Sequence, residues 1–507
     1  MNVIDTTAFR HDRANVPRRL NPWTPGPDDY HRIFREQNPW DLEGRVPDSL
    51  AFAAERPLGQ ALWKRLTTEA PRRFQIILGP RRVGKTTCMY QTVRHLLGAG
   101  VPARLLRWFR LDHPLLMEWP LDDLVRMALR MSDATAQRPL YLFLDELVYA
   151  RDWDLWLKTF HDEGWPVRIA ATSSSTAAPR RRRLESGAGR WEEQALSPYL
   201  FGEFLDLLGK GVRVPVGASL SHTVEASIGA DLNLAGLDAL RRRFLLTGGF
   251  PELLVGRQGG PADESEELLQ SQRVLRSDAV ERAIYKDIPQ AFEIESPLML
   301  ERLLYVLGGQ VAGVLSPNSV CQTLGGMSQP TFDRYLSYLE RTFLVFTLPN
   351  YSSTEESRQR RGRKLYFVDG AIRNAALQRG LSPLDDPAEL GLLTENLVAG
   401  HLHALGLQTQ VRVYHWRDKT HEVDLIYDHP TDPLAFEVAL SPSHSRAGLL
   451  RFLERYPRFQ GRCFLVAPSA PAARPDPVWN PVGSLPLDLL LAAISAQPRP
   501  LAGTTSR

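Results

Sequence analysis

Residues 79–86 carry a pattern of glycines and side chains that binds phosphate groups. They read Gly-Pro-Arg-Arg-Val-Gly-Lys-Thr, which fits the P-loop pattern G-x-x-x-x-G-K-[ST]. The glycines let the backbone wrap a phosphate with its N–H groups, and a helix that begins there adds positive potential. Lys85 is expected to reach the outer phosphates of a nucleotide, and the Thr86 hydroxyl is expected to hold Mg²⁺.

Two further strand ends supply polar groups for the same chemistry. The apolar run 141–144 ends in Asp145 and Glu146. We expect Asp145 to hold Mg²⁺ and Glu146 to orient and deprotonate an attacking water. A third apolar run, 167–172, precedes three serines, of which Ser174 is placed to sense a terminal phosphate, although an ordinary polar turn explains them equally well. The predicted nucleotide-binding residues are Gly79, Pro80, Arg81, Arg82, Val83, Gly84, Lys85, Thr86, Thr87, Asp145 and Ser174.

The elements around these motifs predict an α/β fold. The apolar run 74–78 before the loop reads as a buried strand, and residues 87–97 after it read as a helix. From about 71 to 200, strands alternate with helices, which is typical of a doubly wound parallel sheet.

These motifs and others further along resemble those of prokaryotic AAA+-type P-loop ATPases whose C-terminal domain of unknown function resembles the PD-(D/E)xK nuclease fold. The matching stretches are residues 79–87, 143–146, 172–175, 189–190, 196–198, 201–204, 248–252, 364–369, 395–396 and 422–424. The resemblance implies an ATPase core, a helical lid, a winged helix and a nuclease-like domain. It also implies that Arg190 acts near the nucleotide, as an arginine finger reaching a neighbouring subunit, whereas the residues alone suit a plain surface arginine at least as well.

The expected domain boundaries follow from this resemblance and from local composition. They are an N-terminal arm (1–54), a P-loop ATPase core (55–200), a helical lid (201–294), a winged helix (295–370), a nuclease-like domain (371–480) and a C-terminal tail (481–507). The arm is rich in Pro, Trp and charge, and we expect it to extend and pack on another surface.

Residues 316–368 predict a helix-turn-helix followed by a basic hairpin. Two glycines, 325 and 326, separate a helix at 316–323 from a second helix that begins after Ser328. The exposed face of the second helix and the loop between the next two strands are candidate DNA contacts, since arginines in such a wing bind phosphates. These candidates are Gln329, Thr331, Arg334, Arg358, Arg360, Arg361 and Arg363. A protein-docking role for the winged helix is the alternative.

The C-terminal domain has the carboxylates of a nuclease site without the expected lysine. Glu395 lies in a predicted helix, Asp424 in a predicted strand 422–427, and Glu437 in a predicted strand 434–440. A nuclease of this type needs a lysine two residues beyond the Glu, where this chain has Ala439. Lys419, in a nearby turn, is the one substitute that we identify from the sequence. We therefore expect weak Mg²⁺ or Mn²⁺ binding and little cleavage.

Composition bounds the remaining possibilities. The net charge of +3 over 507 residues confines any nucleic-acid affinity to local patches. Three widely spaced cysteines suit a reducing compartment. No apolar run approaches the roughly 20 residues of a membrane span, and the first residues do not resemble a signal peptide, so we expect a cytoplasmic protein with no membrane partner.

The sequence therefore predicts an ATPase that uses ATP and Mg²⁺. ATP is expected rather than GTP because no guanine-specific [TN]-K-x-D motif occurs. The expected partners are duplex or branched DNA and further copies of the chain, with a hexameric ring as one arrangement. The expected role is remodelling of DNA structure in repair, recombination or mobile-element defence. The alternatives are a nucleotide-gated signalling switch that binds protein through its winged helix, and a nuclease with ATP-controlled access.

Overall fold

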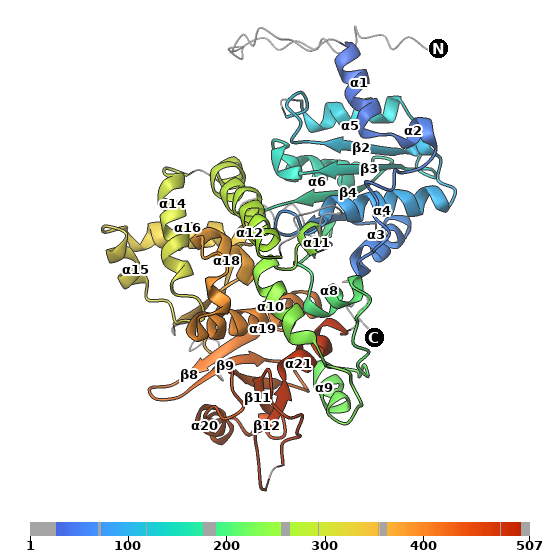
Figure 1. The fold of residues 1–507 in the computed structure, drawn as a ribbon. Helices are drawn as coiled ribbons and strands as arrows, with labels where there is room; N and C mark the ends of the chain where they lie inside the picture. Colours follow the sequence, from blue (N-terminus) through green and yellow to red (C-terminus); the bar gives the residue numbers. More distant parts are fainter. Residues whose placement is uncertain are drawn as a thin grey trace.

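The computed structural model places a P-loop sheet at one end of the molecule and a second sheet at the other, with helices between them (Figure 1). It describes residues 27–68, 72–117, 119–175, 189–254, 264–292, 294–352, 354, 362–476 and 478–497.

The N-terminal sheet is parallel, as the α/β prediction requires. Its described strands are β1 (Phe74–Leu78), β2 (Leu106–Arg110), β3 (Leu140–Asp145), β4 (Val167–Ser173) and β5 (Trp191–Ala195). They pair in the order β2-β3-β4-β1-β5, and every pairing among them is parallel. The three inner strands β1, β3 and β4 are buried along almost their whole length, because both faces of the sheet are covered.

Helices cover both faces of this sheet. Successive residues of strand β3 point to opposite faces and pack against different helices. Phe143 on β3 packs in the same core as the helices α3 (Pro57–Thr67) and α4 (Lys85–Gly98). Its neighbours Leu142 and Leu144 pack on the opposite face with α5 (Leu121–Arg130) and α6 (Trp153–Asp162). The sheet is therefore the middle layer of three, and its strand ends are rigidly placed.

The N-terminal arm differs from the extended segment that we predicted. Its described part forms α1 (Pro27–Gln37) and α2 (Trp40–Glu43). Between them, the Asn38 side chain accepts a 2.7 Å hydrogen bond from the Trp108 amide, and the Trp40 indole donates to the Leu106 carbonyl at 3.2 Å. These contacts satisfy backbone groups of the sheet's edge strand β2, so the arm covers one edge of the N-terminal sheet.

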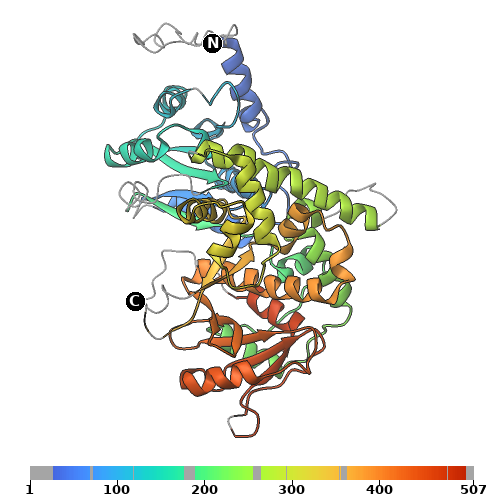
Figure 2. The same ribbon diagram turned by 90° about the vertical axis from the view of Figure 1, so that its left-hand side faces the viewer.

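Residues 201–291 are mostly helical in their described part. Their elements are α8 (Phe201–Leu207), α9 (Leu220–Ile228), α10 (Leu237–Thr247), α11 (Pro251–Leu254), α12 (Glu264–Leu275), the π-helical segments η4 (Arg276–Glu281) and η5 (Ala283–Asp287), and α13 (Ile288–Ala291). The chain from α12 onward runs as one long helix across the middle of the molecule (Figure 2). A π-helix is rare and is frequently found at functional sites.

Three helices and a two-stranded sheet follow. They are α14 (Pro297–Gly308), α15 (Pro317–Thr323), α16 (Gln329–Arg341), β6 (Val345–Pro349) and β7 (Arg363–Phe367), and the two strands pair antiparallel. Gly325 and Gly326 turn the chain between α15 and α16 with φ of +77° and +87°. The Thr331 amide donates to the Ser328 hydroxyl at 3.3 Å, which caps α16. Arg358, Arg360 and Arg361 lie outside the described residues.

The C-terminal sheet is mixed. Its described strands pair in the order β12-β11-β10-β9-β8, with parallel pairing among β10, β11 and β12 and antiparallel pairing on the β8 side. Its elements and the helices around it are α18 (Gly370–Leu377), α19 (Pro387–Thr409), β8 (Val413–Arg417), β9 (Glu422–Tyr427), β10 (Leu434–Val438), α20 (Ala447–Arg455), β11 (Cys463–Ala467), β12 (Gly483–Pro486) and α21 (Leu487–Ser495).

The segment assigned to a C-terminal tail is in large part structured. Strand β12 and helix α21 lie within 481–507, and α21 is buried along almost its whole length. Its Asp488 is bound by the buried Arg241 of α10, which ties the chain end to the helical middle. Short 3₁₀ turns complete the described elements at Ala103–Leu105, Leu147–Tyr149, Ser382–Leu384 and Pro457–Phe459.

Candidate functional site

The predicted P-loop joins β1 to α4 at the carboxyl edge of the parallel sheet. Gly84 adopts a φ of +91°, which favours glycine, immediately before α4 begins. A Cβ on Gly79 would lie 2.2 Å from the Leu196 carbonyl oxygen, so only glycine fits there. The buried Lys85 ammonium donates to the carbonyls of Gly79 and Pro80 at 2.9 and 2.8 Å. Burial lowers the pKa of Lys85.

The other residues of the P-loop differ in how deeply their side chains are buried. Val83 is fully buried beneath the loop, whereas Thr87, in the first turn of α4, is half-buried. Arg82 has a φ of +63° and directs its guanidinium away from the sheet, into ion pairs with Glu252 and Asp278.

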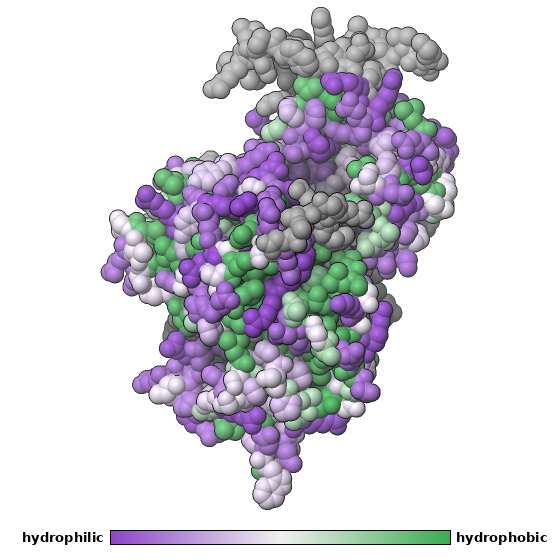
Figure 3. All heavy atoms as spheres, viewed as in Figure 1, coloured by the Kyte–Doolittle hydropathy of each residue, from purple (hydrophilic) through white to green (hydrophobic). Residues whose placement is uncertain are grey.

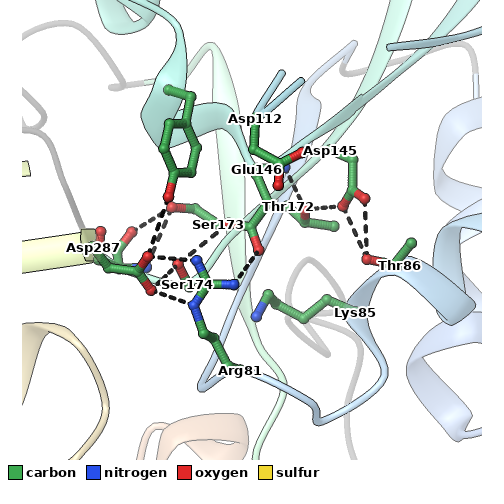
Figure 4. Close-up of polar contacts among 12 residues, drawn as sticks. Arg81, Lys85, Thr86, Asp112, Asp145, Glu146, Thr172, Ser173, Ser174 and Asp287 are labelled. Atoms are coloured by element: carbon green, nitrogen blue, oxygen red, sulfur yellow. Dashed lines mark hydrogen bonds and ion pairs between the residues drawn. The ribbon is translucent and has the colours of Figure 1, made fainter. Parts of the chain in front are cut away.

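The structure brings Thr86 and Asp145 together. The Thr86 hydroxyl donates to Asp145 Oδ1 at 3.0 Å, and the Thr172 hydroxyl donates to the same oxygen at 2.6 Å (Figure 4). Burial, and then the neighbouring Glu146, raise the pKa of Asp145 to about 6. A hydroxyl and a carboxylate oxygen are hard donors that fit Mg²⁺, which keeps several waters and needs few protein ligands.

Glu146, at the end of β3, lies beside Ser174, at the end of β4. Its backbone is in the left-handed region, with φ of 59° and ψ of 56°, and its amide donates to the Thr172 hydroxyl at 3.0 Å. The Ser174 hydroxyl donates to Glu146 Oε2 at 3.2 Å. Strained backbone of this kind persists where the surroundings hold it and is common at active sites. The carboxylate is thus held at the end of β3, where it can accept a proton from water.

Asp287, which sequence reasoning missed, completes this group. It is 1% exposed, and its carboxylate accepts two hydrogen bonds from the Arg81 guanidinium, at 2.7 and 2.5 Å. It also accepts one from the Ser174 hydroxyl at 2.9 Å and a longer one from the Tyr149 hydroxyl at 3.4 Å. Burial works against the charge of Arg81, but Asp287 and Glu146 outweigh it and raise the pKa of Arg81.

Arg190 lies at the other edge of the sheet. Its carbonyl accepts from the amide of Phe74, the first residue of β1, so it stands at the start of the strand whose far end leads into the P-loop. Its guanidinium binds Asp162 at 2.7 and 2.9 Å. Arg190 is therefore not a group of the nucleotide site in its own chain, and its action on a neighbouring copy stays a prediction.

The candidate DNA contacts that the structure describes differ in their exposure. Gln329 and Arg334 are exposed on α16, Thr331 is half-buried near the helix start, and Arg363 is exposed at the start of β7. Arg334 pairs with Glu295 at 3.2 Å. The opposite face of α16 is buried, with Phe332, Tyr335, Leu336 and Leu339 packed in the core.

Three carboxylates of residues 395–424 surround the ammonium of Lys364, which was not predicted to lie there. The Lys364 ammonium lies 2.7 Å from Glu395, 2.6 Å from Glu422 and 2.9 Å from Asp424. Lys419 is exposed, whereas Lys364 is a second lysine that lies directly beside the carboxylates. The one signal in the sequence was Lys364 beside the apolar residues of β7.

Glu437, which was predicted to join Glu395 and Asp424 in the site, does not contact the Lys364 ammonium. Burial, and then the nearby Asp424, raise the pKa of Glu437 to about 9, while burial and Asp424 raise that of Glu395 to about 7. Within the described ranges, no three acidic, histidine or cysteine side chains are grouped as a metal site would require. Lys364 closes a buried ion cluster with Glu395, Glu422 and Asp424. Weak binding of Mg²⁺ or Mn²⁺ by Asp424 and Glu437 stays a prediction.

Family models match three parts of the chain. Residues 71–205 match the model of an AAA domain, residues 238–383 match a domain of unknown function, DUF8612, and residues 390–478 match another, DUF4143. With the parallel sheet and the P-loop, the first match defines a P-loop AAA+ core. The other two matches assign no activity.

Two curated relatives come from the archaeon Methanocaldococcus jannaschii. The uncharacterized protein MJ1637 is 26% identical over 395 residues, which cover 76% of this chain and 79% of that protein. The uncharacterized protein MJ1544 is 22% identical over 364 residues, or 70% and 72% of the two chains. An uncharacterized protein of Haemophilus influenzae is 20% identical over 315 residues, or 60% and 69%.

Solved structures align with the chain at low identity. The Thermotoga maritima RuvB Holliday junction branch migration motor aligns with 66% of this chain and 94% of its own, at 12% identity and a TM-score of 0.25. Cdc6p from Pyrobaculum aerophilum aligns with 66% and 98%, at 13% identity and a TM-score of 0.27. Similarity at this level assigns no substrate or partner.

Hydrophobic and hydrophilic residues are mixed on the surface. On the face drawn in Figure 3, hydrophobic patches are interleaved with hydrophilic residues. None of the helices in the described ranges has the length and apolar character that crossing a membrane requires.

Proposed function

We propose that the protein binds and hydrolyses ATP at the carboxyl edge of its N-terminal sheet. The observation that carries this is the convergence of Lys85, Thr86, Asp145 and Glu146 within one polar cluster. In this proposal the loop amides and Lys85 hold the phosphates, and Glu146 accepts the proton of the attacking water. When bound, Mg²⁺ would be held by Thr86 and Asp145 and would neutralise charge on the phosphates.

The direct test is ATP turnover by the purified full chain. Lys85→Ala removes the ammonium that faces the phosphates, so turnover is expected to fall to background and nucleotide binding to weaken strongly. Lys64→Ala is the matched control, because Lys64 is an exposed lysine on α3. Normal turnover by Lys85→Ala would reject the assignment of the site.

We further propose that the chain binds duplex or branched DNA and remodels its structure as a homo-oligomer, of which a hexameric ring is one form. The exposed Gln329 and Arg334 on α16, with Arg363 at the start of β7, support a DNA-facing surface. ATPase rates measured with single-stranded, duplex and branched DNA added separately test this. Stimulation by one DNA form supports the proposal, whereas rates indifferent to all three favour the signalling switch.

A further inference from the structure

Two consecutive arginines of the P-loop, Arg81 and Arg82, bind carboxylates of the helical elements α11, η4 and η5. Arg81 binds Asp287, and Arg82 binds Glu252 and Asp278. The Arg81–Asp287 pair is the buried one, with side chains 12% and 1% exposed, whereas Glu252 is 63% exposed. Asp278, the other partner of Arg82, is 24% exposed, so the pair at Asp287 is the most buried of the three and the least screened by solvent.

Asp287 contacts groups that are expected to serve a terminal phosphate. Its carboxylate takes two hydrogen bonds from Arg81 and one from Ser174, and Ser174 also donates to Glu146. A carboxylate and a phosphate group share anionic oxygens that arginine binds in a two-pronged manner. In Figure 4, Asp287, Arg81 and Ser174 form one side of the site, and the Lys85 ammonium faces them.

We propose that Arg81 and Ser174 form the subsite for the terminal phosphate of a nucleoside triphosphate, and that the Asp287 carboxylate is a rival ligand for the same two side chains. Asp287 is then a latch: the triphosphate competes for the same donors, and its binding releases the helix that carries Asp287. A diphosphate lacks the competing group and leaves the latch closed. This inference rests on the proposed ATPase function.

The helix that carries Asp287 also contacts α14, so a movement of this helix can change the position of α14. Asp287 ends the π-helical segment η5 and leads directly into α13. In the same stretch, Tyr285 donates to Glu301 at 2.7 Å and Arg276 donates to the Tyr305 hydroxyl at 3.1 Å, and both acceptors belong to α14. A shift of η5 would therefore be transmitted to α14, the first of the three helices of residues 297–341.

The test compares the affinities of ADP and the slowly hydrolysed analogue ATPγS for the full chain, by titration calorimetry. Asp287→Asn keeps the size of the side chain and removes the competing charge. We expect it to raise ATPγS affinity about tenfold, within the range of about 5–150-fold typical of coupled sites, and to leave ADP affinity within about twofold. In the wild type, ATPγS but not ADP should speed amide hydrogen exchange across residues 276–292.

The control is Asp278→Asn, which makes the same chemical change on the same helix but at a partner of Arg82. It should not alter the preference for ATPγS over ADP. Thermal unfolding reports whether each variant is folded, and the exchange measurement on the wild type needs no variant.

Three results would overturn the latch alone: equal changes for both nucleotides in Asp287→Asn, weaker ATPγS binding, or the same selective gain in Asp278→Asn. Failure of the wild type to bind either nucleotide would overturn the ATPase and the latch with it.

Discussion

The ammonium of Lys364 lies 2.9 Å from Oδ1 of Asp424, although Lys364 belongs to the two-stranded sheet and Asp424 to the C-terminal sheet. Glu395 of helix α19 and Glu422 of strand β9 contact the same ammonium. The side chain of Lys364 is 2% exposed, so this single cation joins three elements in a region with little water.

Replacing Lys364 should be strongly destabilising. Lys364→Met keeps most of the side-chain volume but leaves buried carboxylates without their cation, which costs about 3–5 kcal/mol in comparable cases. Urea unfolding measures the loss. Lys419→Met, in an exposed turn, should stay within about 0.5 kcal/mol of the wild type. If Lys364→Met is as stable as the wild type, the cluster does not hold these elements together.

Neutralising the predicted wing tests the DNA surface. Changing Arg358, Arg360, Arg361 and Arg363 together to Gln should weaken binding to all DNA sequences alike. The slope of log affinity against log salt is negative. For every phosphate contact that is lost, this slope becomes shallower by about 0.9 on duplex DNA. Fluorescence anisotropy over a salt series measures this slope. Arg417→Gln and Arg455→Gln, at exposed positions in the C-terminal domain, are the controls. An unchanged slope in the fourfold variant would remove the wing from the DNA surface.

The sequence located local motifs well and distant partners poorly. Strands 74–78 and 422–427 were predicted with their observed bounds, and the parallel α/β core is confirmed. These depend on apolar runs and on a loop pattern that are local in the chain. Asp287 stands 206 positions from Arg81, and no pattern near it shows which cation it binds.

The two chain ends were also mispredicted for a physical reason. The Pro-rich start was expected to extend, but its described part forms short helices because Asn38 and Trp40 find backbone partners on β2. Helix α21 was assigned to a tail, yet its apolar side chains are buried in the C-terminal core. In both cases tertiary contacts decide the conformation, and composition alone does not reveal them.

Arg190 offers a test of assembly. If it acts on the nucleotide of a neighbouring copy, Arg190→Ala should bind ATP normally and lose turnover about 10³-fold or more. Asp162→Ala, which removes its partner within the chain but keeps the arginine, should retain turnover. Mixing Arg190→Ala with Lys85→Ala should restore part of the activity, because mixed oligomers contain some intact sites. Full activity of Arg190→Ala would leave it as a surface ion pair.

Glu146→Gln separates binding from hydrolysis at the candidate site. The amide keeps the size of the side chain and still accepts the hydrogen bond from Ser174, but it cannot take a proton from water. Arg81 loses a carboxylate 3.8 Å away and keeps its closer partner Asp287, so the loop should hold its shape. ATP affinity is therefore expected to stay near that of the wild type, while turnover falls by about 10²–10⁴-fold.

Binding is measured by calorimetry and turnover by phosphate release, with the exposed Glu163→Gln as the control. Undiminished turnover would place the general base elsewhere, and loss of ATP binding would make Glu146 a residue that holds Arg81 and Ser174 in position.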